Sequence, residues 1–278
     1  MRIPILSANA ISSVVSVCLL ALASAPSAAA QERRSLSRVK TVVLDPGHGG
    51  DNYGALSFGG VYEKDIVLEI ALKAKALIEQ RTDAVVILTR DSDRDLPLTE
   101  RIALANESGA DVFISLHCNS SFARVPQGIE TFVLSDKAQD EESRRLSIAL
   151  VEPKGLYASA NDAAAAAVVK EMLLFAAHKD AKVLASLLQP QLVAKTRASN
   201  RGVRELPIVV LRGAEMPAAV VELGFLSHPV ESENLASSAY QVKLAGGIMD
   251  AIVQFDNRTK KNGKAASSGS KPAVAHTK

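Results

Sequence analysis

Short apolar runs alternate with helical segments along most of the chain, and this alternation constrains the fold more than any other feature. Residues 41–45 are β-branched and apolar and lead into Pro46-Gly47, which is typical of a buried strand followed by a loop. Residues 64–80 then place apolar side chains at helical spacing. The same criteria predict strands at 84–89, 111–116, 128–134, 207–211 and 218–223, and helices at 99–107, with Thr99 as N-cap, and 238–254. This order predicts an α/β domain with a mostly parallel sheet flanked by helices on both faces.

The middle and both ends of the chain depart from the alternation. Residues 136–195 are Ala-rich, charged and helical in pattern, which predicts a helical insertion. Residues 1–30 have the pattern of a signal peptide, with an uncleaved N-terminal anchor as the alternative, and their apolar run is too short to predict a membrane span. Residues 258–278 carry six Lys or Arg and no acid, as a disordered basic tail does. That tail is either a solvated end or a weak tether to an anionic wall or membrane surface. A polar linker at 31–40 would then precede a catalytic domain at 41–257.

Composition narrows the function classes. Aromatic residues make up 4% of the 278 residues and Trp is absent, which argues against an aromatic carbohydrate-binding surface or a stacking platform for nucleic acid. One of the two cysteines lies in the expected signal peptide, so the mature chain keeps only Cys118 and forms no internal disulfide. We therefore expect an exported, periplasmic or cell-wall protein that is stabilised by its core alone.

Two histidines and one glutamate stand where a sheet edge collects functional side chains. His48 and His117 follow predicted strands directly, and Glu63 opens the helix at 64–80. Because the carboxyl ends of parallel strands meet at one edge, we expect the three side chains to converge there. Two imidazoles and a carboxylate suit a catalytic Zn²⁺, with a fourth position left for water. Each residue also has an ordinary explanation, as a plain polar His at a strand end or as a Glu that complements a helix dipole.

Glu222 ends a run that is otherwise wholly apolar. A buried carboxylate is costly without a partner, so it is either half of a salt bridge or a general base that passes a proton to a leaving amine. Gly49-Gly50 is compatible with an ordinary turn or an anion-binding loop, and the chain has no GxGxxG or P-loop pattern that would indicate a nucleotide.

Five motifs occur in an order that is typical of one enzyme family. They are Val43 to Gly50 (VLDPGHGG), Glu63, Ser115 to Asn119 (SLHCN), Asn200 to Val203 (NRGV) and Val221 to Ser227 (VELGFLS). Together they closely resemble the zinc-dependent N-acetylmuramoyl-L-alanine amidases of the type 3 amidase family. The resemblance covers about residues 40–256, apart from the middle segment.

The resemblance implies a single α/β domain with a six-stranded sheet. It also implies hydrolysis of the amide between N-acetylmuramic acid and L-alanine in peptidoglycan, for cell-wall remodelling or daughter-cell separation. By the same resemblance, His48, Glu63 and His117 are zinc ligands and Glu222 is the catalytic residue. Cys118 replaces the usual Ala and is either a fifth metal contact or, as we expect, a small buried residue.

The resemblance also suggests how the enzyme is regulated. Some family members carry a helical insertion here that covers the zinc until a partner protein removes it. Residues 136–195 are long enough for this role, and the four candidates for the blocking carboxylate are Glu141, Glu142, Glu152 and Glu171. The apolar cluster 172–175 is either a partner surface or ordinary core. The expected partners are peptidoglycan and a wall-associated activator protein, without nucleic acid and without a stable membrane span after signal cleavage.

Other readings of the same residues stay open. The chain could be a zinc peptidase that cuts within the stem peptide, or a non-catalytic wall-binding protein on an amidase fold. The presence of all four site residues argues against the second. Arg201 and Arg212 are either contacts for a substrate carboxylate or members of structural ion pairs. His228, where the family commonly has Asn, is expected to be a surface or loop residue, and neither His178 nor His276 is expected to bind the metal.

Overall fold

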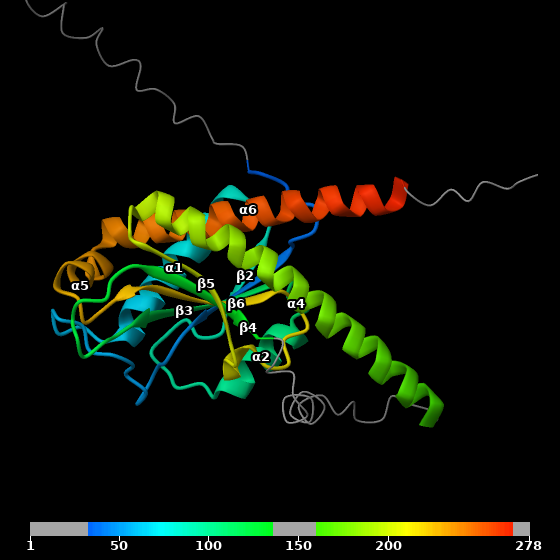
Figure 1. Cartoon of the computed structure of the whole chain (residues 1–278), viewed down its shortest axis with the longest axis horizontal. Helices are drawn as coiled ribbons and strands as arrows, with labels where there is room; N and C mark the ends of the chain where they lie inside the picture. The colour runs from blue at the N-terminus through cyan, green and yellow to red at the C-terminus, as the bar shows by residue number, and fades with distance from the viewer. Residues whose placement is uncertain (1–32, 136–159, 269–278) are drawn as a thin grey trace, which may run out of the picture. The chain divides into compact units, whose positions relative to one another are not determined.

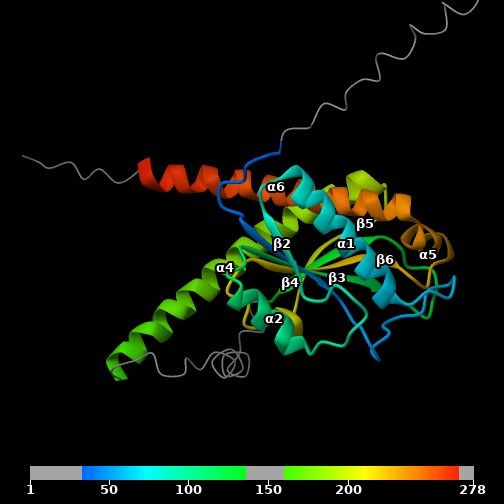
Figure 2. The same ribbon diagram turned by 180° about the vertical axis from the view of Figure 1, so that it is seen from behind.

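A six-stranded sheet forms the centre of the domain (Figures 1 and 2). The computed structural model describes the backbone of residues 33–135 and 160–268 and the side chains of 33–135 and 171–260; the expected signal peptide lies outside the described residues. The strands are β1 (Thr41–Pro46), β2 (Val85–Leu88), β3 (Val112–Asn119), β4 (Ile129–Leu134), β5 (Asn200–Leu206) and β6 (Ala218–Phe225). Their order is β2-β1-β3-β6-β4-β5, and the β4–β6 pair alone is antiparallel. The prediction of a mostly parallel sheet is confirmed.

Helices cover both faces of this sheet. One face carries α1 (Glu63–Arg81), α4 (Ala160–Thr196) and α6 (Ser238–Ser268), and the other carries α2 (Leu98–Glu107) and the short 3₁₀ helix η2 (Val209–Leu211) (Figures 1 and 2). A further helix, α5 (Pro229–Ala236), connects β6 to α6. Successive residues of β1 divide between the two faces, because side chains alternate along a strand. Val42 and Leu44 enter the larger cluster, and Val43 enters the smaller one.

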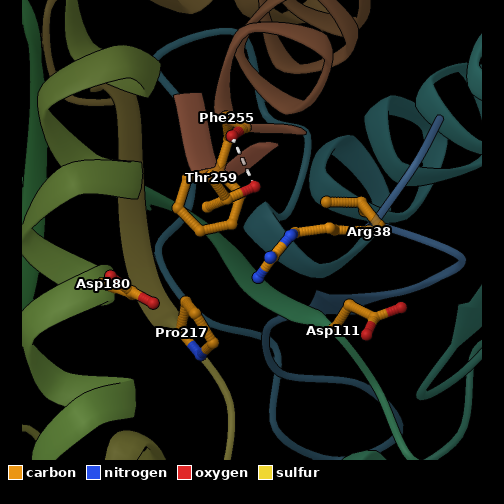
Figure 3. A pocket seen from close by; sticks show the side chains of 7 residues that line it. Arg38, Asp111, Asp180, Pro217, Phe255 and Thr259 are labelled. Atoms are coloured by element: carbon orange, nitrogen blue, oxygen red, sulfur yellow. Dashed lines mark hydrogen bonds between the residues drawn. The ribbon is translucent and has the colours of Figure 1, made fainter. Parts of the chain in front are cut away.

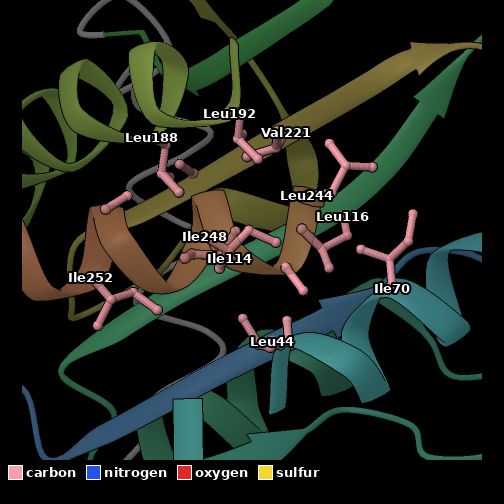
Figure 4. Close-up of a cluster of buried hydrophobic side chains, with 14 of the residues drawn as sticks. Leu44, Ile70, Ile114, Leu116, Leu188, Leu192, Val221, Leu244, Ile248 and Ile252 are labelled. Carbon is pink, nitrogen blue, oxygen red and sulfur yellow. The ribbon is translucent and has the colours of Figure 1, made fainter. Parts of the chain in front are cut away.

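The larger hydrophobic cluster joins the sheet to α1, α4 and α6. Leu44, Ile114, Leu116 and Val221 point from the strands toward these three helices (Figure 4). The helices contribute fully or almost fully buried side chains to this cluster, which include Ile70 of α1, Leu188 and Leu192 of α4, and Leu244, Ile248 and Ile252 of α6. At about 25 cal/mol per Å² of buried apolar surface, this is the dominant favourable contribution to the fold.

The expected insertion at 136–195 is therefore partly core. Residues 136–159 lie outside the described residues, whereas Ala177, Ala181, Leu184 and Leu188 of α4 are buried against the sheet and α6. Only the part of the segment before Ala177 could lie apart from the core. The expected disordered tail at 258–278 also differs from the structure, because α6 continues to Ser268. Residues 269–278 lie outside the described residues.

Two smaller expectations were wrong. The strand predicted at 207–211 is the 3₁₀ helix η2, and the strand of this region is β5 at 200–206. Strand β5 is an edge strand whose residues are mostly exposed, so its sequence is polar and does not resemble a buried strand. Val210 and Leu211 of η2 are buried beneath the sheet, so their apolar sequence does resemble one. Helix α2 begins at Leu98 with Pro97 as N-cap, so Thr99 is not the cap.

Within the described residues, no helix has both the length and the apolar character that crossing a membrane requires.

Candidate metal centre

His48, Glu63 and His117 converge at the carboxyl edge of β1 and β3. Oε1 of Glu63 lies 3.0 Å from Nε2 of His48 and 3.1 Å from Nδ1 of His117. The two imidazole rings meet edge to face with centroids 4.9 Å apart. One ligand atom from each residue lies within 4.8 Å of the others, so the three could hold a metal ion. The convergence expected from the sequence is present.

Two buried arginines fix the loop that carries His48. Arg101 donates to the carbonyl oxygens of Pro46 at 2.8 Å and His48 at 2.7 Å. Arg90 donates to Pro46 as well, at 2.9 Å. The carboxylate of Asp45 accepts from Arg101 at 2.7 Å and balances its charge. Both guanidinium groups are almost fully buried, so the loop is held by charge-assisted hydrogen bonds away from water.

The backbone around His48 is shaped for close contact. His48 itself has φ of 61°, a left-handed conformation that non-glycine residues adopt rarely and that is concentrated at functional sites. A Cβ on Gly47 would lie 2.2 Å from the His117 ring, so only glycine lets β1 approach that imidazole. Nδ1 of His48 contacts Oδ1 of Asn52 at 2.8 Å, which places a proton on Nδ1 and leaves the lone pair of Nε2 for a metal.

Glu63 is held as a carboxylate. Its Oε2 accepts from the backbone N–H of Ala55 at 2.9 Å, and its Oε1 accepts from that of Cys118 at 3.0 Å. Burial acts to raise the pKa of Glu63, but the hydrogen bonds to His117 and His48 outweigh it and hold the pKa well below its usual range. Glu63 also opens α1, as expected, where the helix dipole favours a negative charge.

Cys118 belongs to the hydrophobic core. Its side chain is buried in the larger cluster, and burial raises the pKa of its thiol well above the ordinary value. A protonated thiol is a poor metal ligand, because the thiolate is the species that binds metals. The structure therefore supports the reading of Cys118 as a small buried residue.

Glu222 lies beside the three candidate ligands. In the register of the sheet, His117 of β3 pairs with Glu222 of β6, and Glu222 pairs with Glu130 of β4. Residues paired in this way project to the same face, so the three side chains form one row across the sheet. Oε2 of Glu222 is buried and has no hydrogen-bond partner among the described residues. Burial raises the pKa of Glu222 to about 7, with an opposing effect from His117 and further increases from Glu63 and Glu130.

Glu130 is the site residue that sequence reasoning missed. It is buried, and its Oε1 accepts from Asn119 at 2.8 Å. Its Oε2 lies 3.3 Å from Nε of Arg201 and 3.6 Å from Nη1 of Arg204. Glu130 follows Ile129 near the start of a predicted strand, so an acidic residue inside a strand was the available signal.

The remaining candidates lie in other settings. Arg212 follows η2, and its buried Nε has no hydrogen-bond partner among the described residues. His228 caps α5 by accepting from the backbone N–H of Glu231 at 3.4 Å, in agreement with its expected loop position. His178 is buried on α4, and His276 lies outside the described residues.

A separate hollow opens at the amino ends of the strands. Val39, Asp111 and Pro217, which precede β1, β3 and β6, line it together with Arg38, Asp180, Phe255 and Thr259 (Figure 3). In Figure 3 the hydroxyl of Thr259 donates to the carbonyl of Phe255, 3.1 Å away. Because these strands are parallel, the hollow and the candidate metal centre lie at opposite edges of the sheet.

The arrangement places three candidate metal ligands beside a carboxyl group that is suited to proton transfer. Two imidazoles and a carboxylate offer three donors and leave a coordination position open, as catalytic zinc sites do. A buried carboxyl whose pKa is near 7 can both accept and return a proton at neutral pH. Such a pair is suited to metal-assisted hydrolysis of an amide.

Comparison with known proteins agrees with this chemistry. The family model of N-acetylmuramoyl-L-alanine amidase (Amidase_3) matches residues 42–254. The N-acetylmuramoyl-L-alanine amidase AmiA of Escherichia coli (strain K12) is 28% identical over 233 residues, covering 79% of this chain and 78% of AmiA. The catalytic domain of the amidase CwlV from Bacillus (Paenibacillus) polymyxa has a TM-score of 0.61 at 27% identity, covering 78% of this chain and 98% of that domain. The CwlD amidase of Clostridioides difficile, solved in complex with the GerS lipoprotein, has a TM-score of 0.61 at 28% identity, and the match covers 79% of this chain and 99% of that chain. The chain therefore belongs to the N-acetylmuramoyl-L-alanine amidase family.

Proposed function

We propose that this amidase hydrolyses the bond between N-acetylmuramic acid and L-alanine in peptidoglycan with Zn²⁺ held by His48, Glu63 and His117, and with Glu222 as its proton-transfer group. The observation that carries the proposal is the convergence of three ligand atoms beside a buried carboxylate oxygen that lacks a partner. Membership of the amidase family supplies the reaction and the polymer on which it acts.

The residues present fit a tetrahedral zinc. Ligands about 2.1 Å from such an ion stand about 3.4 Å from one another, and the distances from Glu63 Oε1 to the two imidazole nitrogens are 3.0 and 3.1 Å. Asn52 orients His48, and backbone N–H groups orient Glu63, which are the supporting contacts that metal ligands usually have. Two imidazoles and one glutamate carboxylate form a ligand set that catalytic zinc hydrolases use.

Each group of the site has a separate task in the proposed reaction. Zinc would supply Lewis acidity, which polarises a carbonyl and lowers the pKa of water. Glu222 accepts a proton from the attacking water at its buried carboxylate and returns it to the nitrogen of the leaving L-alanine. Burial raises the pKa of Glu222 above that of an ordinary glutamate, which makes the protonated form of this group easier to reach during the two transfers.

Product analysis tests the reaction. Purified protein lacking residues 1–30 is incubated with sacculi, with added Zn²⁺ or with chelator. Zinc-dependent release of peptides that begin with free L-alanine, with the sugar strands left bare, is the expected result. Release of peptide fragments that leave L-alanine on the sugar would instead identify a stem-peptide peptidase. Binding of sacculi without any release would indicate a non-catalytic wall protein.

We also propose export to the periplasm or cell wall. The composition of residues 1–30 supports it, and peptidoglycan, the substrate, lies outside the cytoplasmic membrane. N-terminal sequencing of the protein recovered from the cell envelope is expected to begin near Gln31. Recovery of the intact N-terminus in the membrane fraction would indicate an uncleaved anchor instead.

The segment before the core half of α4 is our candidate for regulation by a wall-associated activator. Met172, Leu173 and Phe175 are exposed, one turn before the buried Ala177. A structural relative, CwlD, was solved in complex with a lipoprotein. Deletion of residues 156–175 spares the buried part of α4 and is expected to raise activity on sacculi several-fold. A folded deletion variant with unchanged activity would contradict autoinhibition. The double variant Met172→Ser, Phe175→Ser is the matched control, because it keeps the segment and changes only its exposed apolar side chains. It is expected to lose the response to the activator without a rise in activity.

A further inference from the structure

The row of site residues continues past Glu222 to a pair of arginines on β5. Glu130 of β4 pairs with Glu222 on one side and with Gly202 of β5 on the other. Arg201 directly precedes this glycine and Arg204 follows it two positions later, and both guanidinium groups lie near Glu130. The edge strand β5 therefore delivers positive charge to the same row that contains the proposed proton-transfer group.

Two guanidinium groups share one carboxylate in this cluster. Nε of Arg201 and Nη1 of Arg204 lie 3.3 and 3.6 Å from Oε2 of Glu130. Arginine stays protonated in proteins, so the two positive charges outnumber the one carboxylate with which they form ion pairs. A guanidinium that shares its counter-ion beside an active site favours an anionic group of the substrate.

Arg201 has the geometry to receive that group. Its guanidinium carbon Cζ lies over the Phe225 ring, 4.8 Å from the centroid, and this cation–π contact restrains the side chain. Its Nε is buried and, despite the ion pair with Glu130, makes no hydrogen bond to a described residue. The side chain remains 28% exposed, which leaves N–H groups of the fork available to a ligand. Arg204, by contrast, is 54% exposed, and its Nη1 lies farther from Oε2 of Glu130, at 3.6 Å.

We infer that Arg201 is a specificity-determining residue that binds a carboxylate of the stem peptide; this inference rests on the proposed function. Strands β6 and β5 are two sheet spacings apart, or about 10 Å, which an extended peptide covers in about three residues. The acceptor is thus a carboxylate close to L-alanine. When a glutamate joined through its side chain follows L-alanine, its α-carboxylate is free and lies within this reach. The fork of Arg201 matches a carboxylate with two N–H donors.

A pair of substrates that differ only at this carboxylate tests the inference. The zinc-loaded protein is given N-acetylmuramoyl-L-alanyl-γ-D-glutamyl peptide with a free α-carboxylate, or the same compound as its α-carboxamide. We expect kcat/KM to be at least about tenfold higher for the carboxylate, mainly through KM. Arg201→Ala is expected to lose the preference, Arg201→Lys to keep part of it, and the matched control Arg204→Ala to retain it.

A binding measurement separates this inference from the proposed reaction. Calorimetric titration requires no turnover and is done with the product dipeptide L-alanyl-γ-D-glutamate and with its α-carboxamide. Wild type is expected to bind the carboxylate form more tightly than the carboxamide. Arg201→Ala is expected to bind the two forms with the same affinity. Equal kcat/KM for both substrates in wild type, or a preference that survives in Arg201→Ala, would overturn the inference while leaving the amidase reaction intact. Failure to cleave either substrate, with tighter carboxylate binding retained, would overturn the proposed reaction alone. The wild-type comparison stands even if Arg201→Ala does not fold.

Discussion

At Glu222 the sheet buries a carboxylate oxygen that no described group satisfies. An unpaired buried acceptor costs about 1 to 3 kcal/mol, which the fold must offset elsewhere. The same burial raises the pKa of this group toward neutrality, where a carboxyl is useful for proton transfer. Burial of this carboxylate therefore lowers the stability of the fold and at the same time suits the group to proton transfer.

Glu222→Gln separates the two effects. Glutamine keeps the shape of the side chain but cannot carry a proton between water and the leaving amine. We expect kcat to fall by about 10²- to 10⁴-fold on peptidoglycan, the usual contribution of a general acid–base group. The zinc content, measured by atomic absorption, is expected to remain that of wild type, because Glu222 is not among the candidate ligands. Retention of full activity would show that another group transfers the proton.

The site residues that could be predicted are those that strand and helix boundaries locate. His48 follows β1 and Glu63 opens α1, so chain position alone places them at the sheet edge. His117 lies inside β3 rather than after it, yet close enough to its end for the prediction to hold. The supports of the site were not predictable, since Arg101 reaches His48 across 53 residues, and no local pattern identifies such a partner.

Helices α4 and α6 pack closely together at a glycine. A Cβ on Gly247 would lie 3.0 Å from Cα of Leu192 in α4, whereas a Cβ on Gly246 would meet nothing within 4 Å. Both glycines are in the interior of α6, where glycine costs about 1 kcal/mol relative to alanine. The same substitution at adjacent positions therefore tests helix packing against helix propensity.

Gly246→Ala is expected to stabilise the protein by about 0.5 to 1 kcal/mol through propensity alone. Gly247→Ala is expected to be less stable than Gly246→Ala, because the added methyl presses on the backbone of α4. Urea unfolding followed by circular dichroism measures both. Equal stabilisation by the two variants would mean that α4 and α6 are not in close contact here, and would contradict the assignment of residues 177–192 to the core.

Asp256 of α6 fixes the segment that leads into β1. Its carboxylate accepts from the backbone N–H groups of Ser37, Arg38 and Val39 at 2.9, 2.6 and 3.0 Å. Burial acts to raise the pKa of Asp256, but these hydrogen bonds outweigh it and lower the pKa. A lowered pKa means that the contribution to stability is complete above the unfolded value of about 4 and is lost as the pH falls through the lower folded value.

Asp256→Asn is accordingly expected to destabilise the protein by about 1 to 3 kcal/mol at neutral pH. The difference in free energy of unfolding between wild type and variant is expected to narrow below about pH 4, as the wild-type carboxylate takes up its proton. Asp250→Asn on the same helix is the matched control: its partner Lys195 is exposed, so a change below about 1 kcal/mol is expected. A pH-independent difference at Asp256 would point to packing instead of charge.

At the level of elements, prediction succeeded where hydrophobic periodicity reports burial. The strands β1, β3 and β6 are buried on both faces and read as continuous apolar runs. The edge strand β5 has the sequence NRGVREL, which gives no such signal, and the apolar run that follows it forms η2 because the sheet ends there. The hydrophobic pattern of a sequence indicates which residues are buried. At a sheet edge a strand can pair without being buried, so the pattern does not locate it.

For the domain from Arg34 onward, the candidate metal centre draws its ligands from three separate segments, yet each is already fixed by the protein. Buried arginines fix the loop of His48, backbone N–H groups fix Glu63, and β3 carries His117 between β1 and β6. We therefore expect the domain to fold without the metal, although a metal that binds only the folded state must stabilise it.

Removal of zinc by chelation is expected to lower the melting temperature without unfolding the protein at 25 °C. Free zinc at about 1,000 times its Kd stabilises the folded state by about 4 kcal/mol, which a thermal scan of a domain of this size resolves. The scan is repeated with His117→Ala, in which one ligand atom is lost and chelation is expected to have little effect. Unfolding of wild type on chelation would show that the metal, not the arginine and backbone contacts, holds the site together. An unchanged melting temperature would contradict metal binding at His48, Glu63 and His117, because a ligand specific for the folded state cannot leave without a loss of stability.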